Sequence, residues 1–167
     1  MTDHAFEIRL LGKEDRSDFG CGSEPLDRYF KTPVGQDVRR RISACYVAVE
    51  KATGRVAGYY TLSAADVPVS DLPADMTRRL PRYPSVPAAR IGRLAIDRCF
   101  QGRRLGGALL LNAAMRALRS EIAVFALVVN AKDDEAAAFY RHHGFSAFAS
   151  SPLQLIAPLE TFRKLLV

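Results

Sequence analysis

The chain has 167 residues, of which 49% are hydrophobic, so it is the size of one domain and has enough apolar side chains for a core. Its net charge of +6 and isoelectric point of about 9.5 favour an anionic partner, and most of its basic residues are arginines, whose planar guanidinium groups suit phosphate. No apolar stretch approaches the length that crosses a membrane, which excludes a membrane-spanning protein.

The N-terminal residues and the cysteines indicate where the protein works. Charged and polar side chains interrupt any apolar leader: Asp3, His4, Glu7 and Arg9. The cysteines are odd in number and far apart, so we expect neither a disulfide framework nor a zinc site, and we expect each thiol to be buried as a small apolar group. These cysteines are Cys21, Cys45 and Cys99. We therefore expect a soluble cytoplasmic protein without a metal.

Strands and helices are expected in mixed order over the first 66 residues. Alternating apolar and polar residues predict a strand over Phe6–Leu10. Ser23 is a plausible N-cap for a helix, and helical character resumes before Arg39. Two further strands, over residues 42–50 and 56–64, are joined by a Thr-Gly pair that favours a hairpin.

The middle of the chain changes character twice. Residues 67–88 contain five prolines, so we expect only a short helix around residues 74–80, flanked by loops. Residues 89–97 are strand-like, and residues 105–118 are apolar almost all round, which predicts a buried helix. The continuous apolar run over residues 122–129 predicts a strand that is covered on both faces.

The C-terminal third completes the sheet. Asp133 is expected to cap a helix that runs to about residue 143, where Gly144 ends it. The remaining elements are predicted as two strands and a helix, over residues 145–148, 153–157 and 158–166. This order, without repeats or linkers, predicts a mixed α/β, α+β-like protein with a single domain over residues 1–167.

A strand, a short turn rich in glycine and arginine, and a helix follow one another over residues 93–110. This layout aims backbone N–H groups and the positive end of a helix at a phosphate. The glycines fall at positions 102, 106 and 107, which does not fit G-x-G-x-x-G, and no Gly-Lys-Ser/Thr follows. We expect a phosphate-bearing ligand; the alternative is that the glycines only let the helix pack closely on the strand.

The spacing resembles the Gln/Arg-x-x-Gly-x-Gly/Ala pyrophosphate loop of the GNAT superfamily of N-acetyltransferases, with Gln101 first and Gly106 last. Arg104 replaces the middle glycine, so its side chain must point away from the ligand or reach round to a phosphate oxygen. The resemblance implies that acetyl-coenzyme A is the acyl donor. It also implies a cofactor site made by the strand and the loop, namely Leu94, Ala95, Ile96, Gln101, Gly102, Arg103, Arg104, Leu105, Gly106 and Gly107.

A second motif begins at Asn130 and continues as Phe-Tyr-x-x-x-Gly-Phe from Phe139. It resembles the end of the fifth strand and the following helix of these acetyltransferases. The resemblance implies that Asn130, Ala136 and Phe139 complete the cofactor site. It also implies that Tyr140 is the general acid that protonates the leaving thiolate; outside this motif Tyr140 would be interpreted as a core tyrosine.

The same resemblance implies a central mixed sheet, flanked by helices and splayed between its fourth and fifth strands, here residues 89–97 and 122–130. An N–H group on the Ala95 side would then polarise the thioester carbonyl. No general base is evident, which favours an α-amine as the acceptor because such an amine is substantially unprotonated at cellular pH. A water leading to Glu50 or Asp97 stays an alternative.

Beyond the two motifs, the chain resembles the GNAT toxins of bacterial type II toxin–antitoxin modules, which acetylate the free amine of aminoacyl-tRNA. The stretches that carry this resemblance are residues 19–29, 58–63, 80–84 and 91–97. It implies translational arrest and an antitoxin partner, usually a small DNA-binding protein with a ribbon-helix-helix domain. It also implies a homodimer.

A tRNA substrate would account for the excess of arginine. Arg78, Arg79 and Arg82 cluster in the proline-rich segment, and Arg93 lies beside the expected cofactor site, so we expect these four to contact tRNA phosphates. A solvated basic face is the alternative for the cluster. Two other functions stay open: an acetyltransferase for a small molecule or a protein, and a non-catalytic module that binds acyl-coenzyme A.

Overall fold

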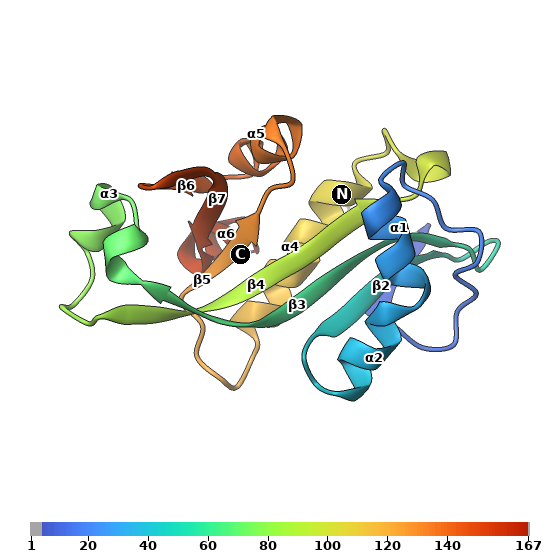
Figure 1. Cartoon of the computed structure of the whole chain (residues 1–167), viewed down its shortest axis with the longest axis horizontal. Helices are drawn as coiled ribbons and strands as arrows, with labels where there is room; N and C mark the ends of the chain where they lie inside the picture. Colours follow the sequence, from blue (N-terminus) through green and yellow to red (C-terminus); the bar gives the residue numbers. More distant parts are fainter. Residues whose placement is uncertain (1–4, 167) are drawn as a thin grey trace. The chain divides into compact units, whose positions relative to one another are not determined.

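The computed structural model describes residues 5–166, so Asp3 and His4 lie outside the described residues. Its seven strands form one sheet in the order β1-β2-β3-β4-β5-β7-β6 (Figure 1). The pairs β1–β2, β2–β3, β5–β7 and β6–β7 are antiparallel, and β4–β5 is parallel. The predicted mixed α/β class is confirmed. Among the described residues, no helix combines the length and apolarity needed to cross a membrane.

The contacts divide the chain into two compact units, residues 1–63 with 92–112 and residues 64–91 with 113–167. In the first unit, α1 and α2 lie over one face of β2 and β3 (Figure 1). Phe30 of α1 is fully buried and stacks on Tyr59 of β3, with ring centroids 4.2 Å apart. The first unit contains β1 (Phe6–Leu10), α1 (Glu24–Lys31), α2 (Pro33–Arg39), β2 (Ala44–Glu50) and the start of β3 (Val56–Pro68).

The end of β4 and the start of α4 complete this unit. β4 spans Ser85–Ile96, a short 3-10 helix spans Arg98–Phe100, and α4 spans Leu105–Leu118, as expected for that helix. Gly54 has φ +76° in the predicted hairpin between β2 and β3, a conformation that glycine adopts without a steric cost. The hairpin and the first strand are confirmed.

The second unit has its own core, in which Val86 and Ala88 of β4 pack with Val128 of β5 and Ile156 of β7. The 3-10 helix Val69–Asp71 and α3 (Ala74–Thr77) lie between β3 and β4. The remaining elements are β5 (Ala126–Asn130), α5 (Asp134–His142), β6 (Ser146–Phe148), β7 (Ser151–Pro158) and α6 (Leu159–Leu166).

Several boundaries differ from those expected. β3 runs to Pro68 and β4 begins at Ser85, so both strands extend further into the proline-rich segment than expected. Proline is tolerated near the end of a strand, where its missing N–H breaks no ladder hydrogen bond. Pro87 still takes part in the sheet, because its carbonyl accepts a hydrogen bond from the Phe125 N–H. β5 begins only at Ala126, and Ile122 is 77% exposed, so the first part of the apolar run is a loop. The expected burial of all three cysteines is wrong for Cys99, which is exposed.

Candidate functional site

The glycine- and arginine-rich loop of the first unit has an unusual backbone. Gly102 has φ +81° and Arg104 has φ +61°. A non-glycine residue in the left-handed region costs roughly 1–2 kcal/mol, because its Cβ approaches the following carbonyl oxygen. Arg104 therefore departs from the family pattern in residue type while it keeps a backbone conformation that favours glycine. Such strain is typical of ligand-binding turns.

Two side chains brace this loop. The Gln101 amide donates hydrogen bonds to the carbonyl oxygens of Cys21 and Ile96, each 3.0 Å long. The Arg103 guanidinium lies 3.9 Å from a Glu50 carboxylate oxygen. It also lies over the rings of Phe6 and Phe100, at 5.0 and 5.7 Å from their centroids. Sequence reasoning missed these contacts, because nothing in the motif identifies the aromatic partners.

Arg104 differs from its neighbour. It is exposed and forms no ion pair within residues 5–166. Of the two arginines in the loop, Arg104 is therefore the one whose charge is left for a ligand. Leu105, the next residue, is buried and begins α4, so the N-terminus of the helix directly follows the loop.

The end of β4 shows which backbone groups are available beside the loop. The Asp97 N–H donates to the Ala57 carbonyl of β3 (2.8 Å), and the Ala95 carbonyl oxygen also faces β3, against Gly58. Successive residues of a strand point their backbone groups to opposite sides. The N–H groups of Leu94 and Ile96 therefore face away from β3, whereas that of Ala95 faces it.

Neither carboxylate that we considered as a base is free. Asp97 is 3% exposed and accepts hydrogen bonds from the Gly20 and Cys99 N–H groups, at 3.0 and 2.8 Å. Glu50 faces Arg103, as described above. Both carboxylates hold the first unit together.

The second unit carries the other motif. Asn130 is the exposed last residue of β5, and the four residues before it are buried. Asp133 caps α5, since its carboxylate accepts a hydrogen bond from the Ala136 N–H (2.8 Å), and this bond is the main cause that lowers the pKa of Asp133. Ala136 and Phe139 are half-buried on this helix, while Gly144 has φ +97° and ends it. The predicted helix, its cap and its terminator are confirmed.

Tyr140 is buried on α5, with its ring 5.1 Å from that of Phe139 and 5.4 Å from that of Phe145. Its hydroxyl has no hydrogen-bond partner among the described residues. Among the described residues, every fully buried polar side-chain atom has a hydrogen-bond partner. The Tyr140 hydroxyl has none, so it must be partly exposed to solvent. Burial raises the pKa of Tyr140, so the phenol stays protonated at neutral pH and can donate a proton.

The two histidines that follow Tyr140 differ in burial. His142 is exposed on the last turn of α5. His143 is half-buried against Phe139, with ring centroids 4.8 Å apart. Burial, together with His142, lowers the pKa of His143, which favours a neutral imidazole there.

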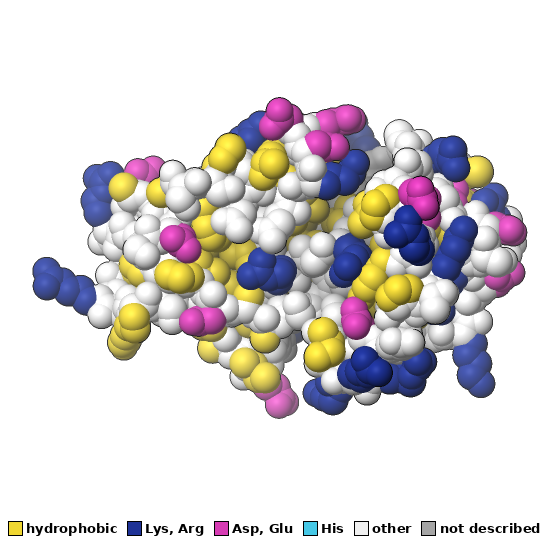
Figure 2. All heavy atoms as spheres, viewed as in Figure 1, with side chains coloured by type: hydrophobic (Ala, Val, Ile, Leu, Met, Phe, Trp, Pro, Cys, Tyr) yellow, Lys and Arg dark blue, Asp and Glu magenta, His cyan; other side chains and the backbone are white. Residues whose placement is uncertain are grey.

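Exposed arginines gather at α3. Arg78, Arg79 and Arg82 follow this helix, and Arg78 lies 3.4 Å from Asp75. Figure 2 shows dark blue side chains at the α3 end and over the region of α1 and α2. Arg93 is not part of this cluster; it lies on β4 within the first unit.

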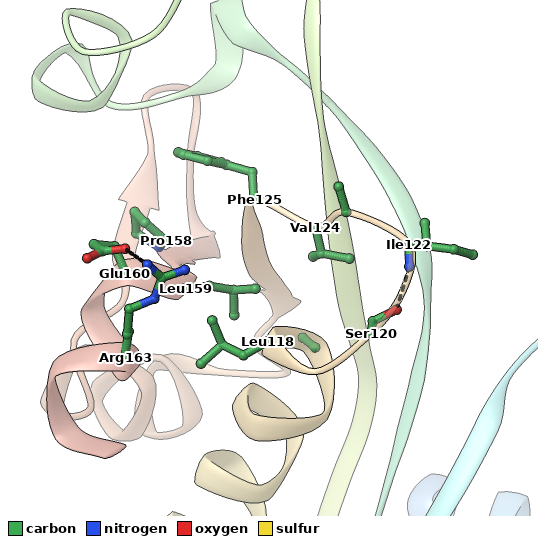
Figure 3. A pocket seen from close by; sticks show the side chains of 11 residues that line it. Leu118, Ser120, Ile122, Val124, Phe125, Pro158, Leu159, Glu160 and Arg163 are labelled. Carbon is green, nitrogen blue, oxygen red and sulfur yellow. Dashed lines mark hydrogen bonds and ion pairs between the residues drawn. The ribbon is translucent and has the colours of Figure 1, made fainter. Parts of the chain in front are cut away.

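A hollow of about 330 Å³ in the second unit lies between the end of α4, the loop before β5 and the start of α6. Figure 3 shows Leu118, Val124, Phe125 and Leu159 around it, with an ion pair between Arg163 and Glu160 at its edge. Its lining holds none of the predicted catalytic or cofactor-binding residues. We therefore do not assign the acyl-transfer site to it.

Both motifs fall within the region that matches a family model. This model is described as an acetyltransferase (GNAT) domain, and it matches residues 41–147. The chain belongs to the GNAT acetyltransferase family. Across 168 residues the chain is 33% identical to the tRNA-acetylating toxin of Mycobacterium tuberculosis H37Rv, with 99% of each protein covered. It is 31% identical to the probable toxin TacT of Sinorhizobium fredii NGR234, over 92% of this chain and 90% of that toxin.

Solved structures of toxins share the fold. A KacT variant in which a tyrosine is replaced by phenylalanine superposes with a TM-score of 0.88 at 27% identity, over 96% of this chain and 99% of KacT. AtaT complexed with acetyl-methionyl-tRNAfMet gives a TM-score of 0.86 at 27% identity, over 97% and 99%. A tyrosine-to-phenylalanine variant of AtaT, bound to acetyl-coenzyme A and to the C-terminus of the antitoxin AtaR, gives 0.80 at 25% identity, over 98% and 99%.

Proposed function

We propose that this GNAT protein is the toxin of a type II toxin–antitoxin module that transfers acetyl from acetyl-coenzyme A to the α-amine of aminoacyl-tRNA. The observation that carries the proposal is the end-to-end match to a tRNA-acetylating toxin, 33% identical over 99% of both proteins. The AtaT complexes with acetyl-coenzyme A and with an acetylated aminoacyl-tRNA support the same donor and product. The end-to-end match also supports one domain over residues 1–167.

The first unit fits a donor that carries a pyrophosphate and an amide-rich arm. In this proposal the N–H groups of Leu94 and Ile96 bind the arm, because they face away from β3. Because the Ala95 N–H faces β3, we propose the Leu94 N–H in its place as the hydrogen-bond donor to the thioester carbonyl. The loop from Gln101 to Gly107 binds the pyrophosphate through its N–H groups and the positive end of α4, and Arg104 adds a charge.

The second unit supplies the acid in this proposal. Acetyl-coenzyme A supplies an acetyl thioester, and Tyr140 donates its phenolic proton to the sulfur as the carbon–sulfur bond breaks. The hydroxyl, which has no hydrogen-bond partner among the described residues, supports this role. Asn130, Ala136 and Phe139, on β5 and α5, complete the donor site. An α-amine with a pKa of about 8 attacks the thioester carbon in its neutral form without a dedicated base, which agrees with the engagement of Asp97 and Glu50. The proton that the new amide nitrogen loses passes to solvent, and solvent restores the proton that Tyr140 gave to the sulfur.

The acceptor and the partners follow the same proposal. We expect the tRNA phosphates to be contacted by four arginines that form no ion pair with a buried carboxylate among the described residues, namely Arg78, Arg79, Arg82 and Arg93. An antitoxin binds the toxin as AtaR binds AtaT, and we propose a ribbon-helix-helix protein for it. We further propose a homodimer that works in the cytoplasm, where charged tRNA is found.

The experiment uses radiolabelled acetyl-coenzyme A with charged tRNA, deacylated tRNA and charged tRNA whose α-amine is already formylated. We expect label on charged tRNA alone, because only that substrate offers a free α-amine. Label on a free amino acid or on a protein lysine, with none on tRNA, would contradict the proposal and favour a small-molecule or protein acetyltransferase. Absence of any transfer by protein that binds the donor would favour a non-catalytic module.

A further inference from the structure

Arg93 is held in an unusual way on β4. It is half-buried, and its guanidinium carbon lies 3.5 Å from the centroid of the Tyr29 ring, over the ring face. Its backbone N–H donates to the Thr61 hydroxyl of β3 (3.0 Å), which fixes the main chain beneath the side chain. Within residues 5–166, Arg93 forms no ion pair. A partly desolvated charge is thus held in place without an anion.

Tyr29 is itself fixed at both ends. The residue is 7% exposed, and its hydroxyl donates a hydrogen bond of 2.6 Å to an Asp37 carboxylate oxygen. Burial and this bond raise the pKa of Tyr29, so the phenol stays neutral. Asp37 is fixed in turn, because its carbonyl oxygen accepts hydrogen bonds from the Ile42 and Ser43 N–H groups, at 2.9 and 3.4 Å. The ring is therefore a rigid platform.

A guanidinium that is held over an aromatic face still has N–H groups that can donate to another partner, because the ring offers it no oxygen acceptor. Two such N–H groups match two oxygens of one phosphate, and partial burial strengthens the attraction by lowering the local dielectric. Carboxylates that would compete for Arg93 are absent from within ion-pair distance among the described residues. The arrangement is suited to a phosphate ester.

We propose that Tyr29 and Asp37 are positioning residues, which hold the Arg93 guanidinium so that it binds a phosphate of aminoacyl-tRNA; this rests on the proposed function. Coenzyme A also carries phosphates. The donor loop has its own charge in Arg104, which forms no ion pair with any described residue. Among the described cations of the first unit, Arg93 lies nearest to an aromatic ring. We therefore assign Arg93 to the acceptor, and the experiment separates the two sources of phosphate.

The experiment measures kcat, KM for charged tRNA and KM for acetyl-coenzyme A in a double-mutant cycle. Arg93→Gln and Tyr29→Leu are each expected to raise KM for charged tRNA by about tenfold and to leave KM for acetyl-coenzyme A unchanged. The double variant is expected to have the same KM for charged tRNA as the single variant with the higher KM, because both changes remove the same contact. Lys13→Gln, at an exposed lysine of the first unit, is the control for a lost charge.

Milder variants separate positioning from folding. Tyr29→Phe keeps the ring face and is expected to raise KM for charged tRNA less than threefold, or about 0.65 kcal/mol. Asp37→Ala frees the phenol and is expected to fall between Tyr29→Phe and Tyr29→Leu. Thermal melting checks that each variant is folded. If Tyr29→Leu does not fold, Arg93→Gln with Asp37→Ala forms the cycle instead.

Each outcome decides something. Effects of Tyr29→Leu and Arg93→Gln that add would overturn the positioning role, as would lower melting temperatures with unchanged KM values. A rise in KM for acetyl-coenzyme A alone would show that the phosphate belongs to the donor and would overturn the assignment to tRNA. Absence of tRNA acetylation by the wild-type protein would overturn the proposed function itself.

Discussion

The two motifs of this protein differ in how far their polar groups are already satisfied. In the first unit, Gln101 and Arg103 are tied to carbonyl oxygens, a carboxylate and two aromatic rings, so the loop is braced before a ligand arrives. In the second unit, the Tyr140 hydroxyl has no partner in the described part of the chain. We interpret the braced groups as a binding frame, and we propose that the groups left without a partner, Arg104 in the first unit and Tyr140 in the second, are those that act on a ligand.

The largest effect is expected from the exposed arginines of the second unit. Reversing Arg78, Arg79 and Arg82 to glutamate should lower kcat/KM for charged tRNA by about 10³ and reduce the salt dependence of tRNA binding by a slope of about 2–3, since three phosphate contacts are lost. Binding of acetyl-coenzyme A should not change. The measurement is a kinetic assay at several salt concentrations.

An equal charge change elsewhere is the control for this cluster. Lys13, Lys51 and Lys164 are exposed, so reversing these three to glutamate alters the net charge by the same amount. If both triple variants lose the same activity, the effect comes from total charge, and the α3 cluster is no tRNA contact.

The hydrogen bonds of Gln101 are expected to hold the loop in the conformation that binds acetyl-coenzyme A. Gln101→Leu keeps the size of the side chain and deletes both hydrogen bonds, so Kd for acetyl-coenzyme A should rise by up to about 30-fold, at about 1 kcal/mol for each of the two net hydrogen bonds. Calorimetric titration measures this Kd. Gln36→Leu, at an exposed glutamine of α2, is the matched control, and an equal loss in both variants would contradict the bracing role.

Arg104 separates backbone strain from charge. Arg104→Gly removes the strain at φ +61° and should raise the free energy of unfolding by roughly 0.5 kcal/mol, whereas Arg104→Ala keeps the strain and should not. Both variants should raise Kd for acetyl-coenzyme A by about threefold to tenfold, because both lose the guanidinium. Denaturant unfolding and titration measure the two effects. An unchanged Kd in both variants would show that the side chain points away from the phosphates.

The smallest effect is expected at the cap of α5. Asp133→Ala should lower the melting temperature at pH 7 by a few degrees, because the Ala136 N–H loses its acceptor. The pKa of Asp133 is lowered in the folded state, so its stabilisation is complete above the unfolded pKa of about 3.9 and is lost as the pH falls through the folded pKa. Wild type and variant should therefore converge at low pH. Asp134→Ala keeps the cap, and an equal loss there would contradict the assignment.

Sequence patterns predicted those features that depend on neighbours along the chain. The bounds of β1 and α4, the Asp133 cap and the Gly144 terminator were all predicted, because spacing and caps are local properties. The start of β5 was not, since apolar character alone does not show that Ile122 lies in a loop. The side of β4 on which the Ala95 N–H lies became clear only from its pairing with β3.

The contacts that give the candidate site its shape join residues far apart in the sequence. The stacking of Arg93 on Tyr29 and the packing of Arg103 on Phe6 arise from tertiary packing, which no local pattern encodes. The site residues named from the resemblance stay predictions, and the structure adds which of them are braced and which are free.

The most direct test of this division is the effect of Tyr140→Phe on chemistry and on binding, measured separately. The substitution removes only the hydroxyl, and the ring contacts with Phe139 and Phe145 can persist. We predict that the single-turnover rate of acetyl transfer to charged tRNA falls by about 100-fold or more, while Kd for acetyl-coenzyme A stays within about twofold of wild type. An unchanged rate, or a loss of donor binding that accounts for the whole effect, would contradict the account.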